Sequence, residues 1–215
     1  HIGNYLGALK NWVELQKQYE CIFCVVDVHA LTTMGTGDNS IIQDDIREMV
    51  LDWLAAGIDP DRSIIFVQSK VPEVMSLYTI LGMITPMGWL LRVPTFKEKV
   101  RQMDETEDSV NYGLVGYPVL MAADIILYKA DTVPVGEDQV PHLELTREIV
   151  RRFNNKFGDF FPGPQAKLTE TPLIVGLDGK QKMSKTLNNH VDLAASPEET
   201  TKRVAGAFTD PKRLR

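Results

Sequence analysis

Residues 132–139 read Thr-Val-Pro-Val-Gly-Glu-Asp-Gln, and a long stretch with helical periodicity follows them to residue 155. The β-branched run predicts a strand over residues 132–135, and the later periodicity predicts a helix from about Asp138 to Asn155. Gly136 permits a tight turn between the two elements, and Asp138 suits the N-cap of the helix. Because ligands of α/β folds bind at the carboxyl ends of strands, this turn is a candidate site.

Two further strands are predicted upstream, over residues 21–28 and 63–68, as short apolar runs typical of a buried parallel sheet. Helices alternate with the strands, which predicts an α/β fold with a doubly wound, Rossmann-like parallel sheet. The polar residues 92–110 are expected to form a mobile excursion, and residues 158–185 a loop. The predicted helices begin after Asn4, cover residues 41–56, begin near Pro72, cover residues 117–129 and begin at Pro197.

The composition is that of a globular protein: 215 residues, 44% hydrophobic and 24% charged, with a net charge of −6. It excludes a disordered or fibrous chain, and no apolar run approaches the roughly 18 residues of a membrane span. The charge is uneven, because residues 180–215 hold 8 basic and 4 acidic side chains. This basic end is compatible with a phosphorylated partner, although a solvated charged surface explains it equally well.

Cys21 and Cys24 form a C-x-x-C pair that could be a redox pair, half of a zinc site, or two cysteines of a strand. Strand positions i and i+3 face opposite sides, so the two sulfurs are poorly placed to share a ligand. We interpret the pair as structural and expect no protein-borne metal site. An unbridged pair fits the reducing cytoplasm.

His1-Ile2-Gly3-Asn4 stands at a predicted helix entrance, where free N–H groups suit a phosphate. Gly3 allows close backbone approach, and His1 and Asn4 can donate to phosphate oxygens. Plain helix capping by Gly and Asn is the alternative.

The segment Lys180-Gln181-Lys182-Met183-Ser184-Lys185-Thr186 follows a turn at Asp178-Gly179. Its lysines are flexible point charges that can follow a phosphate during reaction. A solvated basic loop is the alternative.

Tyr117, Met121 and Asp124 share one face of the predicted helix at residues 117–129. A buried Asp124 needs a hydrogen-bond partner, which an apolar ligand with one N–H or O–H donor would supply. A structural aspartate paired with water is the alternative. At the turn after residue 135, a carboxylate can accept from ribose hydroxyls, and Gln139 can reach a substrate amine or carboxylate.

Together these segments resemble the class I aminoacyl-tRNA synthetases: residues 1–4 are similar to the HIGH signature, and residues 182–186 to the KMSKS signature. Residues 27–32, 117–124 and 136–147 resemble the tryptophanyl family within this class. Thr186 departs from the usual Ser but keeps a hydroxyl. The tyrosyl family shares the architecture and is the alternative, as is a small adenylyltransferase of the same superfamily or a non-enzymatic RNA-binding module.

The resemblance implies that tryptophan is activated with ATP and Mg²⁺ to tryptophanyl-adenylate and is then transferred to tRNA(Trp). It implies that Lys182 and Lys185 follow the leaving pyrophosphate, with Lys97 as a further phosphate contact. The residues that it assigns to ATP are His1, Gly3, Asn4, Gly136, Glu137, Asp138, Lys182, Met183, Ser184, Lys185 and Thr186.

The resemblance also implies a binding site for the amino acid. Asp124 accepts the indole N–H, and such a site rejects phenylalanine, which would leave a buried carboxylate unpaired. The other residues assigned to tryptophan are Tyr117 and Gln139 at the amine, Met121, Val133 and Val135 as walls, and His29 as a lining residue.

The resembling family implies a catalytic domain over residues 1–188 and the start of a C-terminal helical, anticodon-binding region over 189–215. The chain is expected to be a fragment that lacks the family's first strand and most of the C-terminal domain. A homodimer is expected, with no membrane partner. Helices near residues 75–87 and 116–128 are the candidate interface, and burial in the core of one subunit is the alternative.

Overall fold

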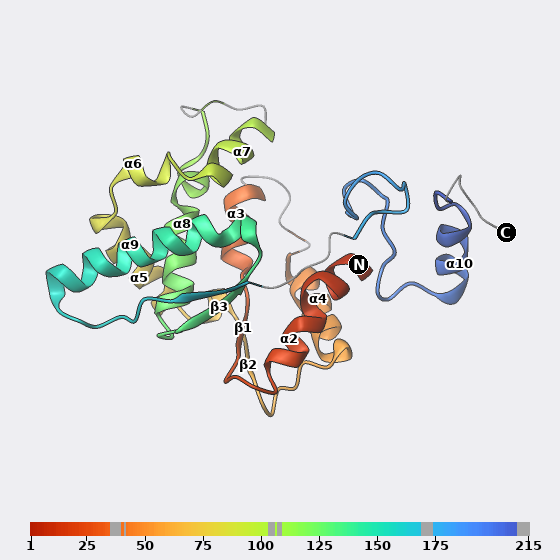
Figure 1. Cartoon of the computed structure of the whole chain (residues 1–215), viewed down its shortest axis with the longest axis horizontal. Helices are drawn as coiled ribbons and strands as arrows, with labels where there is room; N and C mark the ends of the chain where they lie inside the picture. Colours follow the sequence, from red (N-terminus) through yellow and green to blue (C-terminus); the bar gives the residue numbers. More distant parts are fainter. Residues whose placement is uncertain (35–39, 41, 103–105, 107–108, 169–173, 210–215) are drawn as a thin grey trace. The chain divides into compact units, whose positions relative to one another are not determined.

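The computed structural model describes residues 1–34, 40, 42–102, 106, 109–168 and 174–209 (Figure 1). The chain divides into two compact units. The first unit contains His1–Phe23, Arg47–Ile65 and Thr169–Arg215, and the second contains Cys24–Ile46 and Phe66–Leu168.

The N-terminal helix begins at the first residues of the chain and contains one wider turn. It consists of α1 (Ile2–Asn4), the π-helical turn η1 (Tyr5–Leu9) and α2 (Lys10–Leu15). The chain continues into β1 (Ile22–Val25), α3 (Asp27–Met34), α4 (Ile42–Ala56) and β2 (Ile64–Val67), and β1 pairs with β2. The predicted helix at 41–56 is confirmed over the described residues 42–56, and both predicted strands exist in shorter form.

Aromatic packing joins the elements of the first unit. The Trp12 ring stacks on Phe23 with 5.7 Å between centroids and meets Trp53 edge-on at 5.8 Å. Buried Gln16 donates through Nε2 to the carbonyl of Gly57 at 2.7 Å. Gly57 has φ +110, a conformation that favours glycine and ends α4.

The second unit is built around α8 (Tyr112–Ile126), whose residues from Leu114 to Leu120 are all buried. Helices α3, α5 (Glu73–Ile84) and α9 (Val140–Phe157) pack against it. Smaller elements complete the unit: η2 (Gln68–Lys70), α6 (Met87–Leu90), α7 (Pro94–Gln102), β3 (Thr132–Val135), η3 (Glu137–Gln139) and β4 (Gln165–Leu168).

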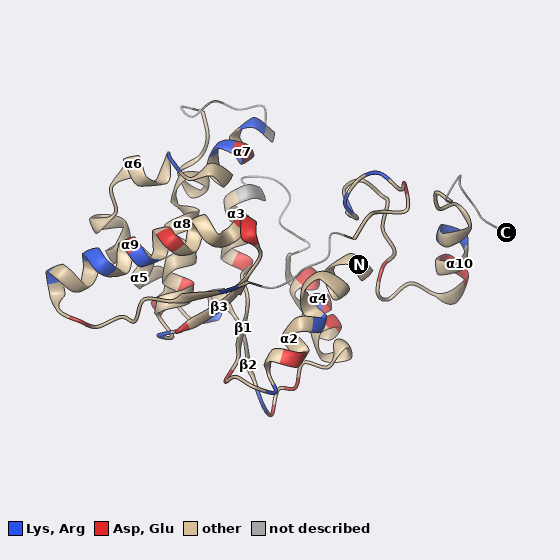
Figure 2. Ribbon diagram, viewed as in Figure 1, with Lys and Arg blue, Asp and Glu red and all other residues tan. Residues whose placement is uncertain are grey.

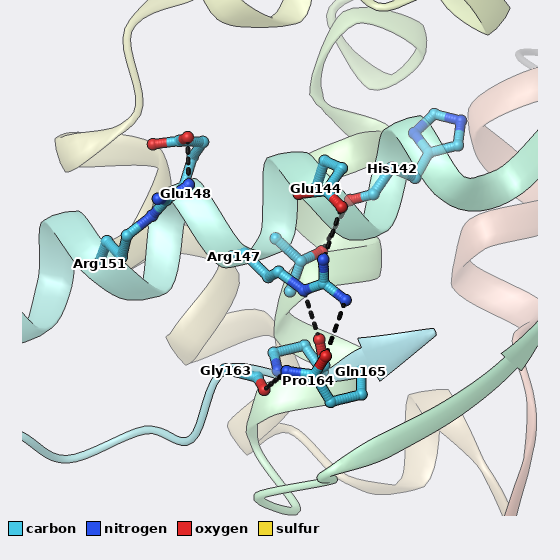
Figure 3. Close-up of polar contacts among 9 residues, drawn as sticks. His142, Glu144, Arg147, Glu148, Arg151, Gly163, Pro164 and Gln165 are labelled. Atoms are coloured by element: carbon cyan, nitrogen blue, oxygen red, sulfur yellow. Dashed lines mark hydrogen bonds and ion pairs between the residues drawn. The ribbon is translucent and has the colours of Figure 1, made fainter. Parts of the chain in front are cut away.

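Strands β3 and β4 are parallel, with Thr132 opposite Gln165 and Val135 opposite Leu168, and α9 connects them. Arg147 of α9 ties this βαβ unit together, because its Nε donates to the carbonyl of Pro164 at 2.6 Å (Figure 3). The α/β class and the strand at 132–135 are therefore confirmed. The described strands form two two-stranded sheets.

Three local predictions are wrong. Asp138 is not a helix N-cap, because it lies inside η3. The N-cap residues are Gly136 for η3 and Gln139 for α9, and neither helix start has a side-chain capping hydrogen bond. Residues 94–102 of the expected excursion form α7, since Phe96 and Val100 are buried one turn apart beneath a charged outer face. Residues 103–105 and 107–108 lie outside the described residues.

The expected loop at 158–185 also contains regular structure. It includes β4 and an antiparallel bridge between Val175 and Lys182. The Gly, Pro and Lys content of the segment predicts a loop, so neither the strand nor the bridge was expected. Strand pairing depends on the partner segment, which local composition does not reveal. Residues 169–173 lie outside the described residues. The final helix is confirmed as α10 (Pro197–Ala205), capped by Ser196 and ended by Gly206.

Candidate active site

In the second unit, Asp124 lies near the C-terminal end of α8 with 14% of its side chain exposed. Gln68 Nε2 donates to both carboxylate oxygens, at 2.7 and 2.9 Å. The other end of the same amide, Gln68 Oε1, accepts the backbone N–H of His29 at 3.1 Å, and Nδ1 of His29 lies 3.5 Å from Asp124 Oδ2. The carboxylate is thus held by a buried amide and retains lone pairs for a ligand donor.

Gln68 is a candidate site residue that the sequence analysis did not name. It is 1% exposed and follows β2 directly. The rule that ligand sites gather at the carboxyl ends of strands could have found it, as it found the turn after β3.

Tyr117 lies two turns before Asp124 on the same face of α8. Its hydroxyl belongs to a buried group of three polar side chains. Its Oη lies 3.0 Å from Thr95 Oγ1 and 3.1 Å from His142 Nε2, and the latter two atoms are 2.6 Å apart. The His29 ring meets the Tyr117 ring edge-on at 5.9 Å. The structure therefore brings Tyr117, His29 and Asp124 together, as the sequence predicted.

His142 is 2% exposed, and Nδ1 has no hydrogen-bond partner among the described residues. Burial, followed by repulsion from Lys99 and His29, lowers the pKa of His142 to about 4. At neutral pH the imidazole is uncharged, so it adds no positive charge beside the Tyr117 hydroxyl.

Lys99, which the sequence analysis did not single out, is half-buried, with Nζ 4.1 Å from the centroid of the Tyr117 ring. Burial lowers the pKa of its ammonium group. Lys97, the predicted phosphate contact, is exposed. Helical spacing alone does not make this distinction, because residue 99 lies three positions after buried Phe96 and residue 97 lies three positions before buried Val100.

At the turn after β3, the predicted residues differ in exposure. Val135 is buried, Gly136 and Gln139 are half-buried, and Glu137 and Asp138 are exposed. Asp138 Oδ2 accepts from Gln139 Nε2 at 2.7 Å. A Cβ on Gly136 would lie 2.7 Å from Asp138 Oδ1, so a larger residue there would require the exposed Asp138 side chain to move. The wall residues Met121 and Val133 pack against the core of the same unit.

In the first unit, residues 1–4 and 182–186 meet. A Cβ on Gly3 would lie 3.2 Å from Cβ of Met183, so only glycine fits there without displacement. Nδ1 of His1 accepts the N–H of Asn4 at 3.3 Å and caps the helix. A neutral His1 therefore carries its proton on Nε2, where it can donate to a ligand.

The loop that carries the lysines is held by buried Met183 and presents charge outward. Met183 is 6% exposed, and its N–H donates to the carbonyl of Ile174 at 2.8 Å. Lys182, Lys185 and Thr186 are exposed. In Figure 2 the loop that precedes α10 carries blue, basic stretches of ribbon. No ion pair joins either lysine to a carboxylate within the part of the chain that the structure describes.

Comparison with known proteins finds one matching family, the class I tRNA synthetases described as "W and Y", over residues 1–215. A tryptophan–tRNA ligase of Aquifex aeolicus is 39% identical over the whole chain and 71% of the relative. A tryptophan–tRNA ligase of Thermotoga maritima is 47% identical over the whole chain and 65% of the relative.

Solved structures of the same class of synthetase also match this chain. The tryptophanyl-tRNA synthetase of Campylobacter jejuni, complexed with ADP and tryptophan, matches with a TM-score of 0.89 and 39% identity over the whole chain and 65% of that protein. A tyrosyl-tRNA synthetase of Archaeoglobus fulgidus matches with a TM-score of 0.76 and 23% identity, over 98% of this chain and 62% of that one, and so shares the fold. The chain thus spans about two thirds of these proteins.

Proposed function

The chain belongs to the class I tRNA synthetases of the W and Y type, and within them to the tryptophan–tRNA ligases; from this premise we propose that it activates tryptophan with ATP. A tryptophan carboxylate oxygen attacks the α-phosphorus, and the bond to the bridging oxygen of pyrophosphate breaks. The terminal ribose hydroxyl of tRNA(Trp) then attacks the acyl carbon, and AMP leaves. Such transfers depend on positioning and charge stabilisation rather than on a protein nucleophile.

Tryptophan binding is assigned to the second unit. Asp124 accepts the indole N–H, while Gln68 holds the carboxylate in its acceptor orientation. Tyr117 and Gln139 hold the ammonium group, with uncharged His142 behind the Tyr117 hydroxyl. His29 lines the site, and Met121, Val133 and Val135 are its apolar walls.

Phosphate binding is assigned to two segments that carry lysines, the loop with Lys182 and Lys185 and the helix α7 with Lys97 and Lys99. Lys182 and Lys185 neutralise charge that moves onto pyrophosphate, because their ammonium groups are exposed on a held backbone. Lys99 is a further contact for the carboxylate or phosphate beside Tyr117, in addition to Lys97. The remaining predicted ATP contacts are His1, Gly3, Asn4, Gly136, Glu137, Asp138, Met183, Ser184 and Thr186.

Mg²⁺ is proposed to accompany ATP, bound through the phosphate oxygens, where it would neutralise their charge. Among the described residues, no group of three or more His, Cys, Asp or Glu side chains is placed to hold a metal ion. Lys182 and Lys185 are suited to the same phosphates.

The observation that carries the proposal is Asp124, one carboxylate in an otherwise apolar helix, held by a buried amide. We expect Asp124→Ala to lower kcat/KM for tryptophan by about 100-fold, because one charge-assisted hydrogen bond to the ligand is lost and Nε2 of Gln68 is left without an acceptor. Tryptophan-dependent pyrophosphate exchange measures this, and ATP binding stays unchanged. Asp131→Ala, an exposed aspartate in the same unit, is the control.

Unchanged exchange in Asp124→Ala would refute the assignment. Running tyrosine beside tryptophan separates the tyrosyl alternative, since a phenol O–H could also donate to Asp124. Pyrophosphate exchange that depends on tyrosine and not on tryptophan would show that the substrate is tyrosine.

A homodimer is also proposed, with its interface on the outer side of α5 and α6. This side exposes Met75, Ile80, Met83 and Met87 at 37, 47, 79 and 52%. The other candidate, the helix near 116–128, is wrong, because most of α8 is buried within the second unit.

We further propose that residues 1–188 form the catalytic domain and that residues 189–215 begin an anticodon-binding helical region. A cytoplasmic location is proposed from the unbridged Cys21 and Cys24. In the described ranges, no helix combines the length and apolarity that crossing a membrane requires.

A further inference from the structure

Asn189 lies outside the signature-like residues 182–186, yet its side chain is bonded to both sides of Met183. Its Oδ1 accepts the N–H of Ser184 at 2.7 Å, and its Nδ2 donates to the carbonyl of Lys182 at 3.2 Å. Asn189 is 5% exposed. A single buried amide therefore fixes the backbone from which Lys182 extends.

The same amide is anchored to the preceding turn. Asn189 Nδ2 also donates to Asp178 Oδ2 at 3.0 Å, and the backbone carbonyl of Asn189 accepts the N–H of Leu177 at 2.7 Å. The other oxygen of Asp178 accepts the N–H groups of Lys180 and Gln181 at 3.0 and 3.1 Å. Turn and loop thus form one hydrogen-bonded frame, in which Asn189 donates to Asp178 and Lys182 and accepts from Ser184 and Leu177.

Gly176 leaves room for the side chain of Asn189. A Cβ on Gly176 would collide with the amide group of Asn189, so the glycine is required by the position of that side chain. In contrast, neighbouring Asn188 is exposed, and its Oδ1 accepts from Arg203 at 3.1 Å.

We infer that Asn189 is a positioning residue for ATP activation: it holds the backbone of residues 182–184 so that Lys182 and Lys185 meet the phosphates. The inference rests on the proposed function. A lysine side chain is flexible, so its placement depends on the backbone at its root, and preorganisation of that backbone lowers the ordering cost of the transition state. Tryptophan binding, assigned to side chains of the second unit, does not need this frame.

The test compares Asn189→Asp with Asn188→Asp in tryptophan-dependent pyrophosphate exchange by the purified protein. Asn189→Asp removes both donated bonds and sets a second carboxylate against Asp178. Asn188→Asp adds the same charge one residue away and keeps an acceptor for Arg203. We expect Asn189→Asp to lower kcat/KM for ATP by about 100-fold while KM for tryptophan stays within about twofold, and Asn188→Asp to match the wild type.

The double variant Asp178→Asn with Asn189→Asp exchanges donor and acceptor. Asn at 178 can donate to Asp at 189, which can still accept the N–H of Ser184, so exchange is expected to recover about tenfold over Asn189→Asp. If Asn189→Asp does not fold, as judged by circular dichroism, activity of a folded double variant supports the inference, and an inactive or unfolded one overturns it.

Three outcomes separate the hypotheses. Wild-type protein without tryptophan-dependent exchange contradicts the proposed function. Active wild type with equal activity in the two single variants overturns the role of Asn189 alone. Equal loss of tryptophan and ATP parameters in Asn189→Asp shows general structural damage and also overturns that role.

Discussion

The Asp124 cluster in the second unit and the Lys182–Thr186 loop in the first unit solve different physical problems. In the cluster, the working groups themselves are buried and paired, as Gln68 at 1% exposure and His142 at 2% show. In the loop, the working lysines are exposed and the held part is the backbone, through Asn189. Under the proposed function, the indole N–H is recognised by fixed side chains, and a phosphate whose charge changes during the reaction is contacted by flexible ones.

The largest expected effect tests the loop. Lys182→Ala should lower kcat for tryptophan-dependent pyrophosphate exchange by about 100- to 1000-fold, because it removes a charge from the transition state. Tryptophan affinity, measured by calorimetry, should not change. Lys180→Ala, an exposed lysine of the same loop, should retain activity. Equal losses in the two variants would mean that the loop contributes only general charge.

The next largest effect tests the buried cluster around Asp124 and Tyr117 through the pH dependence of folding stability, which the protonation of His142 should produce. The pKa of His142 falls from 6.5 to about 4 on folding, so between these values the unfolded chain binds more protons than the folded protein. This contribution to stability is complete above about pH 6.5 and is lost as the pH falls towards 4. Between pH 7 and 5 the loss should be about 2 kcal/mol in the free energy of unfolding.

Urea denaturation of the wild type and of His142→Gln at both pH values measures this loss. The variant lacks the titrating group, so its stability should change less with pH by that amount. The same pH dependence in both proteins would show that His142 is not the group responsible.

The smallest effect tests the support of Asp124. Gln68→Leu keeps the side-chain volume but removes the amide that donates to the carboxylate, so KM for tryptophan should rise about tenfold with little change in kcat. Steady-state exchange kinetics give both constants. Gln43→Leu on the exposed side of α4 is the matched control. If KM for tryptophan is unaffected, Asp124 needs no support from Gln68.

Much of the fold was predictable from short-range patterns. The strand at 132–135 and the helices α4 and α10 follow from β-branched runs, apolar periodicity and capping residues. α7 was missed because charged residues outnumber the two buried positions that define its inner face. Local polarity gives the wrong answer wherever a few apolar contacts decide the structure.

The candidate site was predictable where one element carries it. Tyr117 and Asp124 share a helix face, and their spacing alone brought them together. Gln68 and His142 escaped prediction because each reaches its partner across a long sequence separation: Gln68 lies 56 residues before Asp124, and His142 lies 25 after Tyr117. The place of Gln68 directly after a strand could mark it as a candidate site residue, but no local pattern encodes which distant residue either side chain pairs with.

By itself, the sequence determined the kinds of element and the chemical groups available, because dihedral sterics, periodicity and capping act within a few residues. Only the tertiary structure decided that Lys99 rather than Lys97 lies over Tyr117 and that Asn189 rather than Asn188 holds the loop. Each pair offers the same chemistry one or two positions apart. Which member is used depends on the face that packing buries, and packing is settled by distant elements.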